Sequence, residues 1–339
     1  MKKSKKIIVA IIVVLIVAVV GIVSFVNSKL DKITYDKNNN IEINSDIIDE
    51  ADDEEIDTSN LPQKEDSDVV LPEGDVSSNN DVFNILLLGT DERTKEFNVN
   101  ARADSMMILS LNLKEGTAKL VSLERGVGVP IEGRNIDLLT HTFRYGGAEL
   151  TLKTVQDCFK VDVDRYVRVN FNMFEQIINA IGGVDINLTE LECQGLNGQV
   201  YTNAKTKAYV TPGINHLDGY DALQYARIRF IDDDWHRIVR QRNVIQAVVN
   251  QTKNLSILEI NQVADTVLPM VMTNLTKSEI TNLIFHAPKF LGVQIEQMTI
   301  PTADTCWGAV GVDGRRYIGM DFEANAKILQ EFFYGEATE

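Results

Sequence analysis

The first 26 residues constrain this chain more than any other stretch, because they combine a basic start with a long uncharged run. Residues 7–26 read IIVAIIVVLIVAVVGIVSFV and hold no charge over 20 positions, directly after four lysines in residues 1–6. A run of this length can cross a bilayer as a helix. A cleaved signal peptide has a shorter apolar core and a small-residue cleavage site, and a buried core helix does not explain so uniform a run of Ile and Val beside lysines. Residues 7–26 are therefore predicted to be an uncleaved transmembrane helix.

The same lysines predict the topology of the chain. Positive charge beside a membrane helix stays on the cytoplasmic side, so residues 1–6 are expected to form a cytoplasmic tail. Everything after residue 30 then lies outside the cell. The expected location is the cell membrane, with a single pass, a cytoplasmic N-terminus and an extracytoplasmic folded part.

The net charge of −16 is distributed unevenly along the chain. Residues 31–81 hold 17 acidic residues against three lysines. Such a composition buries too little apolar surface to fold alone, so residues 27–81 are predicted to be an acidic, disordered extracytoplasmic linker. Residues 82–339 are predicted to be the folded domain. Nucleic-acid binders usually carry a basic face, so we expect no nucleic-acid partner.

Within residues 82–339, short apolar runs alternate with amphipathic stretches, a pattern that predicts α/β layers around a mixed central sheet flanked by helices. Strands are expected at 82–89, 105–113, 118–125, 165–170, 184–188, 227–230 and 293–301. The tight connection at 114–116 predicts that the second and third strands form a hairpin. Helices are expected at 146–159, 173–183, 218–227 and 236–252. The polar, Gly-rich residues 191–216 are expected to be a variable loop or a small hairpin.

The three cysteines give no chemical signal. Cys158, Cys193 and Cys306 contain no CxxC pair, and an odd number allows at most one disulfide and one free thiol. No metal or redox motif follows from this spacing.

Two carboxylates flank the first expected strands. Asp91 follows the strand at 82–89, and Asp104 immediately precedes the strand at 105–113. Ligands in α/β proteins usually bind where the carboxyl ends of strands meet. Mg²⁺ prefers one or two carboxylates, several waters and a substrate phosphate. A magnesium site is one reading; an Asx-turn at Asp91 and a turn cap at Asp104 are the other.

Residues 227–242, RIRFIDDDWHRIVRQR, gather five arginines in an acidic chain. Arg227 and Arg229 would point to the same side of the expected strand. One face of the expected helix continues from polar residues to Val, and its polar residues are Arg237, Arg240 and Gln241. This face lies near the helix N-terminus, where the dipole favours anions. Arg242 lies on another side of the helix.

The arginines could be neutralised in two ways. Internal pairing with the aspartates at 232–234 is possible, but three acids do not neutralise five arginines. An external anion is the alternative, and the planar guanidinium suits phosphate oxygens. The pattern favours an external anion. Arg125, at the end of the strand at 118–125, is a further arginine that on its own would be a surface charge.

The ordered motifs of residues 82–252 resemble the LytR-CpsA-Psr family. They are NILLLGTDER, RADSMMILSLN, VSLERGVGVPI, FRYGGAELTLKTVQ, DRYVRVNFNMFEQIINAIGGVDINL, LDGYDALQYARIRF and HRIVRQRNVI. No single motif is specific, but the set in this order is. The resemblance implies a membrane-anchored α/β domain with a long apolar groove for a polyprenyl chain. It implies transfer of a glycopolymer phosphate, such as wall teichoic acid or capsular polysaccharide, from a polyprenyl-pyrophosphate carrier to peptidoglycan.

The resemblance also implies roles for individual residues. It makes Asp91 and Asp104 the carboxylates associated with Mg²⁺ or Mn²⁺, and catalytic together with Arg125. The pyrophosphate-binding residues that it implies are Arg102, Arg125, Arg227, Arg229, Arg237, Arg240 and Gln241.

Two positions depart from the family pattern. Gly126 stands where the family usually has Asp, and Leu138 where it often has Lys or Arg. His141 and Arg144 lie nearby in the sequence and could compensate for the second change. These departures concern the preference for acceptor or carrier.

The expected function is therefore a phosphotransferase of the bacterial envelope, typical of Gram-positive cells. Two alternatives remain open at the level of sequence. The same site could hydrolyse the pyrophosphate, with water as acceptor. The protein could also be a non-enzymatic envelope sensor or a transcriptional attenuator, although the expected topology separates its arginines from the chromosome.

Overall fold

The computed structural model describes residues 27–36, 56–64, 69–92, 101–131, 134, 136–311 and 314–335. Within these ranges no helix is both long enough and apolar enough to cross a bilayer. The predicted cytoplasmic tail and transmembrane helix, residues 1–26, lie outside the described residues.

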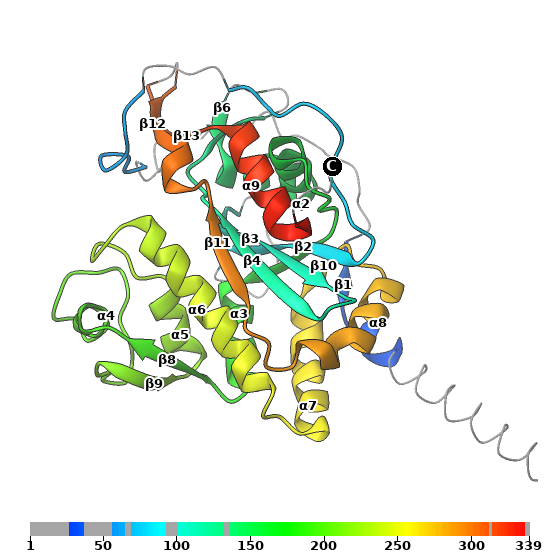
Figure 1. The fold of residues 1–339 in the computed structure, drawn as a ribbon. Helices are drawn as coiled ribbons and strands as arrows, with labels where there is room; N and C mark the ends of the chain where they lie inside the picture. Colours follow the sequence, from blue (N-terminus) through cyan, green and yellow to red (C-terminus); the bar gives the residue numbers. More distant parts are fainter. Residues whose placement is uncertain are drawn as a thin grey trace, which may run out of the picture.

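A central mixed sheet organises the described part of the chain (Figure 1). Its strands, in spatial order, are β1 (Thr34–Tyr35), β10 (Met272–Thr273), β7 (Tyr166–Asn170), β2 (Val82–Thr90), β3 (Ala103–Asn112), β4 (Thr117–Leu123) and β11 (Glu296–Ile300). The pairs β2–β7 and β4–β11 are parallel, whereas β2–β3 and β3–β4 are antiparallel. The predicted mixed α/β fold and the predicted β3–β4 hairpin are confirmed.

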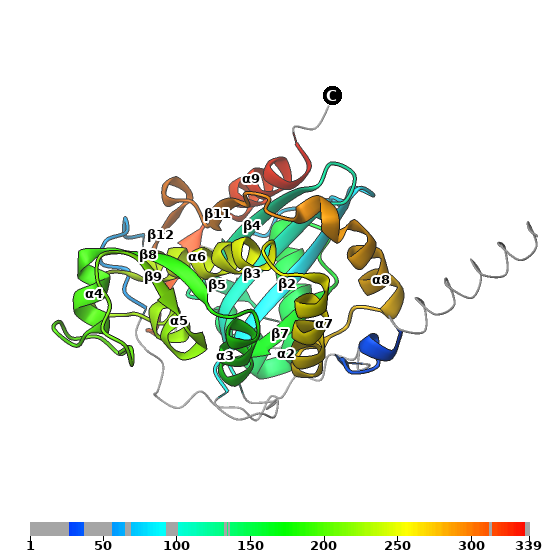
Figure 2. The same cartoon turned by 90° about the horizontal axis from the view of Figure 1, so that it is seen from below.

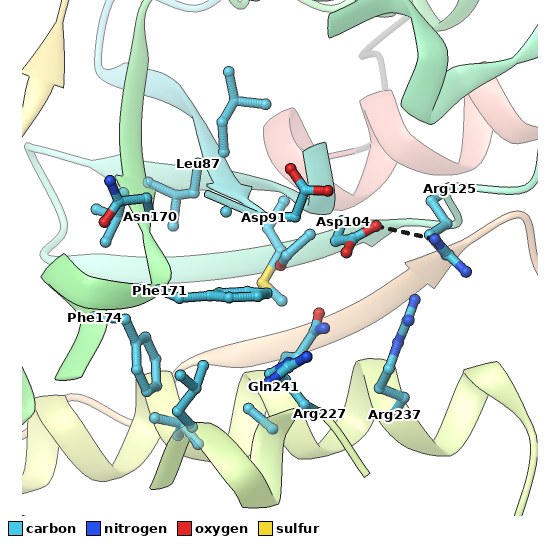
Figure 3. A pocket seen from close by; sticks show the side chains of 18 of the residues that line it. Leu87, Asp91, Asp104, Arg125, Asn170, Phe171, Phe174, Arg227, Arg237 and Gln241 are labelled. Carbon is cyan, nitrogen blue, oxygen red and sulfur yellow. Dashed lines mark hydrogen bonds and ion pairs between the residues drawn. The ribbon is translucent and has the colours of Figure 1, made fainter. Parts of the chain in front are cut away.

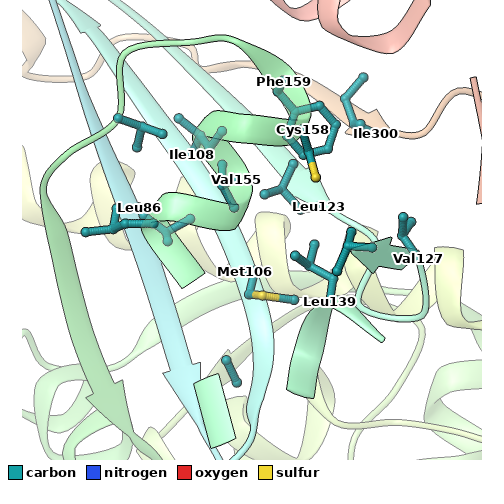
Figure 4. Close-up of a cluster of buried hydrophobic side chains, with 14 of the residues drawn as sticks. Leu86, Met106, Ile108, Leu123, Val127, Leu139, Val155, Cys158, Phe159 and Ile300 are labelled. Carbon is teal, nitrogen blue, oxygen red and sulfur yellow. The ribbon is translucent and has the colours of Figure 1, made fainter. Parts of the chain in front are cut away.

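Helices cover both faces of this sheet, because apolar side chains of a strand alternate between its two sides. Leu86 and Leu88 of β2 face the main core, which α2 (Leu139–Phe159) and α9 (Phe322–Tyr334) close (Figure 4). Leu87 belongs to a smaller cluster on the opposite face, which α6 (Asp234–Thr252) covers. Figure 2 shows α3 (Phe171–Ala180) and α7 (Ile257–Val267) on this second face beside α6.

A second core lies beside the sheet. It is built from β8 (Val184–Leu188), β9 (Gly213–Leu217), α4 (Glu190–Leu196) and α5 (Gly219–Ala226), and it reaches Val244 of α6. The strands β8 and β9 are antiparallel, so part of the predicted polar loop is a hairpin strand. The same loop also holds α4, which begins at a capping box between Thr189 and Glu192.

The remaining elements are short or peripheral. The small hairpins are β5 (Gly128–Pro130) with β6 (Ile136–Leu138) and β12 (Cys306–Val310) with β13 (Arg316–Met320). Further helices in the described ranges are α8 (Lys277–His286) and the 3₁₀ segments Leu268–Met270, Ala287–Phe290 and Ala303–Thr305. The three cysteines are buried as free thiols.

The predicted strand at 227–230 is wrong. Arg227 is the C-cap of α5, and the N–H of Ile228 donates to the carbonyl oxygen of Tyr225, so the backbone still follows the end of the helix. Ile228 is buried in the second core. The alternation of Arg, Ile, Arg and Phe therefore reflects one buried side chain at a helix end, and no strand of the described residues pairs with this segment.

The described parts of residues 27–81 differ from the predicted disordered linker. β1 pairs in parallel with β10 at the sheet edge, and Lys32 contacts Asp265 of α7 at 2.7 Å. Gln63 pairs with Gly308 of β12, and Ser77 with Val161. Scattered apolar residues explain this packing, because Leu30 and Ile33 are buried and Ile56 and Leu61 pack against the main core. Average composition conceals such residues.

Candidate active site

A large cavity lies between the second face of the sheet and helices α3, α5 and α6. Its volume is about 770 Å³. Leu87 and Gly89 of β2 face it, and so does Asp91, because alternate residues of a strand share one side. Asn170 at the end of β7 and Arg125 just after β4 reach the same edge. The carboxyl ends of these strands therefore meet at the cavity, as the position of Asp91 predicted.

Two carboxylates and two arginines form the sheet side of its polar end. Arg125 Nη1 lies 3.0 Å from Asp104 Oδ1. The backbone N–H of Arg102 donates to Asp91 Oδ1 at 3.0 Å, and Arg102 Nε lies 3.9 Å from Asp91 Oδ2. Burial raises the pKa of Asp91, the N–H of Arg102 opposes this, and the nearby charge of Asp104 adds to it. The two carboxylates are thus close enough to repel each other.

Helix α6 and the segment before it supply the opposite side of the polar end (Figure 3). Arg227, Arg229, Arg237 and Gln241 all line the cavity there. Arg237 Nη2 contacts Asp234 at 2.7 Å, and burial lowers the pKa of Arg237 to about 10, which leaves it charged at neutral pH. Arg227 lies with its guanidinium 4.6 Å from the centre of the Phe171 ring. Figure 3 shows Arg227, Arg237 and Gln241 facing Asp104 and Arg125 across the cavity.

Arg240 does not line the cavity. Its guanidinium donates two hydrogen bonds of 2.7 Å to Asp232 and one of 2.9 Å to the carbonyl oxygen of Ile228. Its shared helix face with Arg237 was therefore misleading, and internal pairing accounts for Arg240. Arg242, expected to point elsewhere, bonds Ser122 and Thr299 in the core.

The other end of the same cavity is apolar. Phe171 and Phe174 come from α3, and the later turns of α6 contribute Val244 and Val248. Further apolar lining residues are Met107, Val167, Val169, Ile177, Ile245 and Val249. The sequence indicated apolar faces on these helices but did not separate core from cavity.

Two residues near Arg125 were missed by sequence reasoning. Ile56, from the acidic segment, lines the cavity, and a Cβ on Gly126 would lie 3.0 Å from its side-chain carbons. A side chain at position 126 would therefore require the Ile56 side chain to shift slightly. Glu124 is buried behind Arg125, and its Oε2 has no hydrogen-bond partner among the described residues. Burial and the charge of Asp234 raise the pKa of Glu124 to about 8.

A hydrogen-bond network around the Asp137 carboxylate lies next to Leu138, the second departure from the family pattern. Leu138 and His141 both line the cavity, whereas Arg144 does not. His141 Nδ1 lies 2.8 Å from Asp137 Oδ1, and the hydroxyl of Tyr145 donates to Asp137 Oδ2 at 2.8 Å. Burial alone would raise the pKa of Asp137, but these hydrogen bonds lower it to about 2.

The donor set at the polar end fits a hard divalent cation that keeps other ligands. No group of three or more His, Cys, Asp or Glu side chains that could hold a metal occurs in the part of the chain that the structure describes. Asp91 and Asp104 offer two carboxylates in mutual repulsion. Mg²⁺ is commonly bound by one or two carboxylates together with waters and substrate phosphates.

An arginine-rich end joined to an apolar end defines a site for an amphiphile with a phosphate-like head. The LytR_cpsA_psr family model matches residues 35–333. The chain belongs to this family.

Curated relatives and solved structures agree with this assignment. The polyisoprenyl-teichoic acid–peptidoglycan teichoic acid transferase TagT of Bacillus subtilis (strain 168) is 34% identical over 222 residues, which cover 65% of this chain and 68% of TagT. A structure of TagT bound to LIIa-WTA matches with a TM-score of 0.61 and 28% identity, covering 75% of this chain and 90% of that one. A structure of the LytR-CPS2A-psr family protein YwtF (TagT) with bound octaprenyl pyrophosphate lipid matches with a TM-score of 0.57 and 26% identity, covering 79% and 95%.

Proposed function

We propose that this protein transfers a glycopolymer phosphate from a polyprenyl-pyrophosphate carrier to peptidoglycan. The observation that carries the proposal is the continuity of the cavity, which joins Arg125, Arg227 and Arg237 to the apolar wall of α3 and α6. A pyrophosphate fits the first part and a polyprenyl chain the second. The names of the relatives, a teichoic acid transferase and a structure with a bound polyprenyl pyrophosphate, support this choice.

The reaction is a displacement at phosphorus. A hydroxyl of the acceptor glycan attacks the phosphorus joined to the donor sugar, and the new P–O bond forms as the bond to the bridging oxygen breaks. Polyprenyl monophosphate leaves with the electron pair of that bond. Catalysis of this kind is mostly positioning and charge stabilisation, and arginines opposite the carboxylates provide both.

The chain's own residues have distinct tasks in this scheme. Arg125, Arg227 and Arg237 hold pyrophosphate oxygens, with Arg102, Arg229 and Gln241 around them. The apolar wall holds the leaving lipid and keeps water away. Asp91 and Asp104 are the candidate acceptors for the hydroxyl proton, and Asp104 also contacts Arg125 at 3.0 Å.

A divalent cation belongs to the same proposal. Asp91 and Asp104 would hold Mg²⁺, or Mn²⁺ in its place, and the ion would supply neutralisation of pyrophosphate charge. Residues 7–26 would anchor the protein in the cell membrane with the domain outside.

The test uses the full chain in detergent and a polyprenyl-pyrophosphate donor carrying a short saccharide. Release of polyprenyl phosphate should depend on a peptidoglycan oligosaccharide and should fall sharply for Arg227→Ala. The matched control is Arg316→Ala, an exposed arginine of β13 outside the cavity lining. Release at the same rate without acceptor would identify a hydrolase, and binding without turnover a sensor; either result would overturn the transferase proposal.

A further inference from the structure

Two exposed aromatic rings lie at the polar end of the cavity. Tyr201 is 78% exposed and Phe230 is 60% exposed. Their ring centres are 5.4 Å apart and their planes are tilted by 39°. Phe230 also lines the cavity. Large apolar side chains exposed together at the rim of a pocket are typical of ligand-binding surfaces.

The backbone holds Phe230 in this exposed position. Its φ is +73°, a value that is unusual for a bulky residue with a Cβ. The side-chain oxygen of Asn203 accepts the N–H of Arg229 at 2.8 Å, which ties the loop of Tyr201 to the loop of Phe230. Backbone strain of this kind persists where surrounding contacts impose it, and it is concentrated at functional sites. The local backbone conformation therefore holds the Phe230 ring in its exposed position at the edge of the cavity.

The order of groups along the cavity suggests what these rings contact. From the C-terminal part of α6 towards its start, the lining changes from Val248 to Gln241 and Arg237. Phe230 precedes α6 in the chain, is next to Arg229, and lines the cavity with it. About 11 residues of helix separate Arg237 from Val248, which is ~16 Å. The cavity lining therefore passes from the apolar wall to an arginine cluster formed by Arg125, Arg227, Arg229 and Arg237. The aromatic pair adjoins this cluster through Phe230, the neighbour of Arg229.

A lipid-linked saccharide has its parts in the same order: chain, pyrophosphate and sugar. We propose that Tyr201 and Phe230 form a stacking platform for the sugar rings joined directly to the pyrophosphate of the donor. The apolar face of a pyranose presents C–H groups, and aromatic faces carry the negative part of the ring quadrupole. This inference rests on the proposed function.

The donor sugar is a better occupant than the acceptor glycan because of a covalent constraint. The donor sugar is bonded to the phosphate that the arginines hold, so it must lie beside them. Phe230 is the neighbour of Arg229, which lines the cavity as a member of the arginine cluster. Tyr201 comes from the polar segment between α4 and β9, so changes in this segment would alter which glycopolymer the site accepts.

The experiment compares two probes on the full chain in detergent micelles. One is polyprenyl pyrophosphate without sugar, and the other is the same lipid carrying a pyrophosphate-linked N-acetylhexosamine disaccharide. Tyr201→Ala should weaken binding of the second probe about five- to tenfold, the size expected for one lost aromatic stack. Binding of the first probe should stay the same, and Tyr201→Trp should retain binding of both.

Tyr209→Ala is the matched control. Tyr209 belongs to the same polar segment and is 73% exposed, but it does not line the cavity or contact Phe230 within the described structure. Its removal should change neither affinity. A second variant, Phe230→Ala, should repeat the selective loss of Tyr201→Ala, and its thermal unfolding temperature shows whether the loop is intact.

Three results would overturn the platform. The first is an equal loss of affinity for both probes, and the second is no loss for either probe. The third, seen in rate measurements, is that Tyr201→Ala only raises the acceptor concentration needed for half-maximal rate. The last would assign the rings to the acceptor glycan. If the wild-type chain binds neither probe, the proposed function fails as well; if it binds both but Tyr201→Ala is unchanged, only the platform fails.

Discussion

Arg240 donates a hydrogen bond of 2.7 Å to each carboxylate oxygen of Asp232. Neither side chain lines the cavity, and Glu192 lies 3.6 Å from the same guanidinium. Three residues earlier on the same helix, Arg237 does line the cavity. One helix face thus carries an arginine paired within the fold and an arginine that lines the cavity.

Arg240→Met should destabilise the fold. The change leaves Asp232 and Glu192 partly buried without their cation, and loss of one partner of a buried pair costs about 3–5 kcal/mol. The free energy of unfolding in urea measures this. A variant of unchanged stability that no longer binds polyprenyl pyrophosphate would instead place Arg240 in the ligand site.

Asp91→Asn should abolish most of the activity while leaving the fold intact. Loss of a side chain that accepts the proton in the transition state typically costs about 10²–10⁴ in rate. Stability should not fall, because burial raises the pKa of Asp91 and the amide removes a desolvated charge beside Asp104. Turnover and thermal unfolding of the same preparation test both statements.

Metal removal is a separate prediction for the same carboxylates. EDTA should stop turnover by the wild-type chain, and Mg²⁺ or Mn²⁺ should restore it. Full turnover in EDTA would contradict the assignment of Asp91 and Asp104 as metal ligands, whatever the effect of Asp91→Asn.

Glu124 should make stability depend on pH. Its pKa is about 8 in the folded chain, against an ordinary value of 4.5. Between these values the folded state keeps a proton that the unfolded state releases, so stability falls as pH rises from about 4.5 to about 8. Glu124→Gln should flatten this part of the pH profile, measured by urea unfolding at several pH values. An unchanged slope would show that Glu124 titrates normally.

Val248→Asp should discriminate between donors by the length of their lipid. Val248 lies in the apolar end of the cavity, away from the arginines. A carboxylate there should weaken binding of long-chain polyprenyl pyrophosphate by an order of magnitude or more, because each buried CH₂ contributes about 0.8 kcal/mol. A short-chain analogue that does not reach Val248 should bind as before. Equal weakening of both would indicate that the lipid lies elsewhere.

The strands and the carboxyl-end site could be predicted because they follow from local periodicity. Leu86, Leu87 and Leu88 alternate between two cores, and Asp91 and Arg125 follow strands of the same sheet. The position of each residue after its strand was therefore enough to bring them to one edge.

The arginine cluster could be predicted only in part. Helical periodicity predicts on which side of α6 Arg240 lies, but it does not reveal that Asp232 forms an ion pair with it. Arg227 and Arg229 reach the cavity from a helix end instead of a strand. Ile56 lies in an acidic stretch, and only long-range packing against Gly126 reveals its place.

The acidic stretch has a different meaning once both of its ends are known. β1, near its start, and β2, directly after it, belong to one sheet, so the described parts of this stretch begin and end at the folded domain. Lys29 and Lys32 fasten the entry to Asp265, and Asp31 contacts Lys277. If residues 7–26 span the membrane, only a few residues separate the bilayer from the fold. The domain would then lie close to the membrane. Deleting acidic residues between β1 and β2 would not change its distance from the lipid surface.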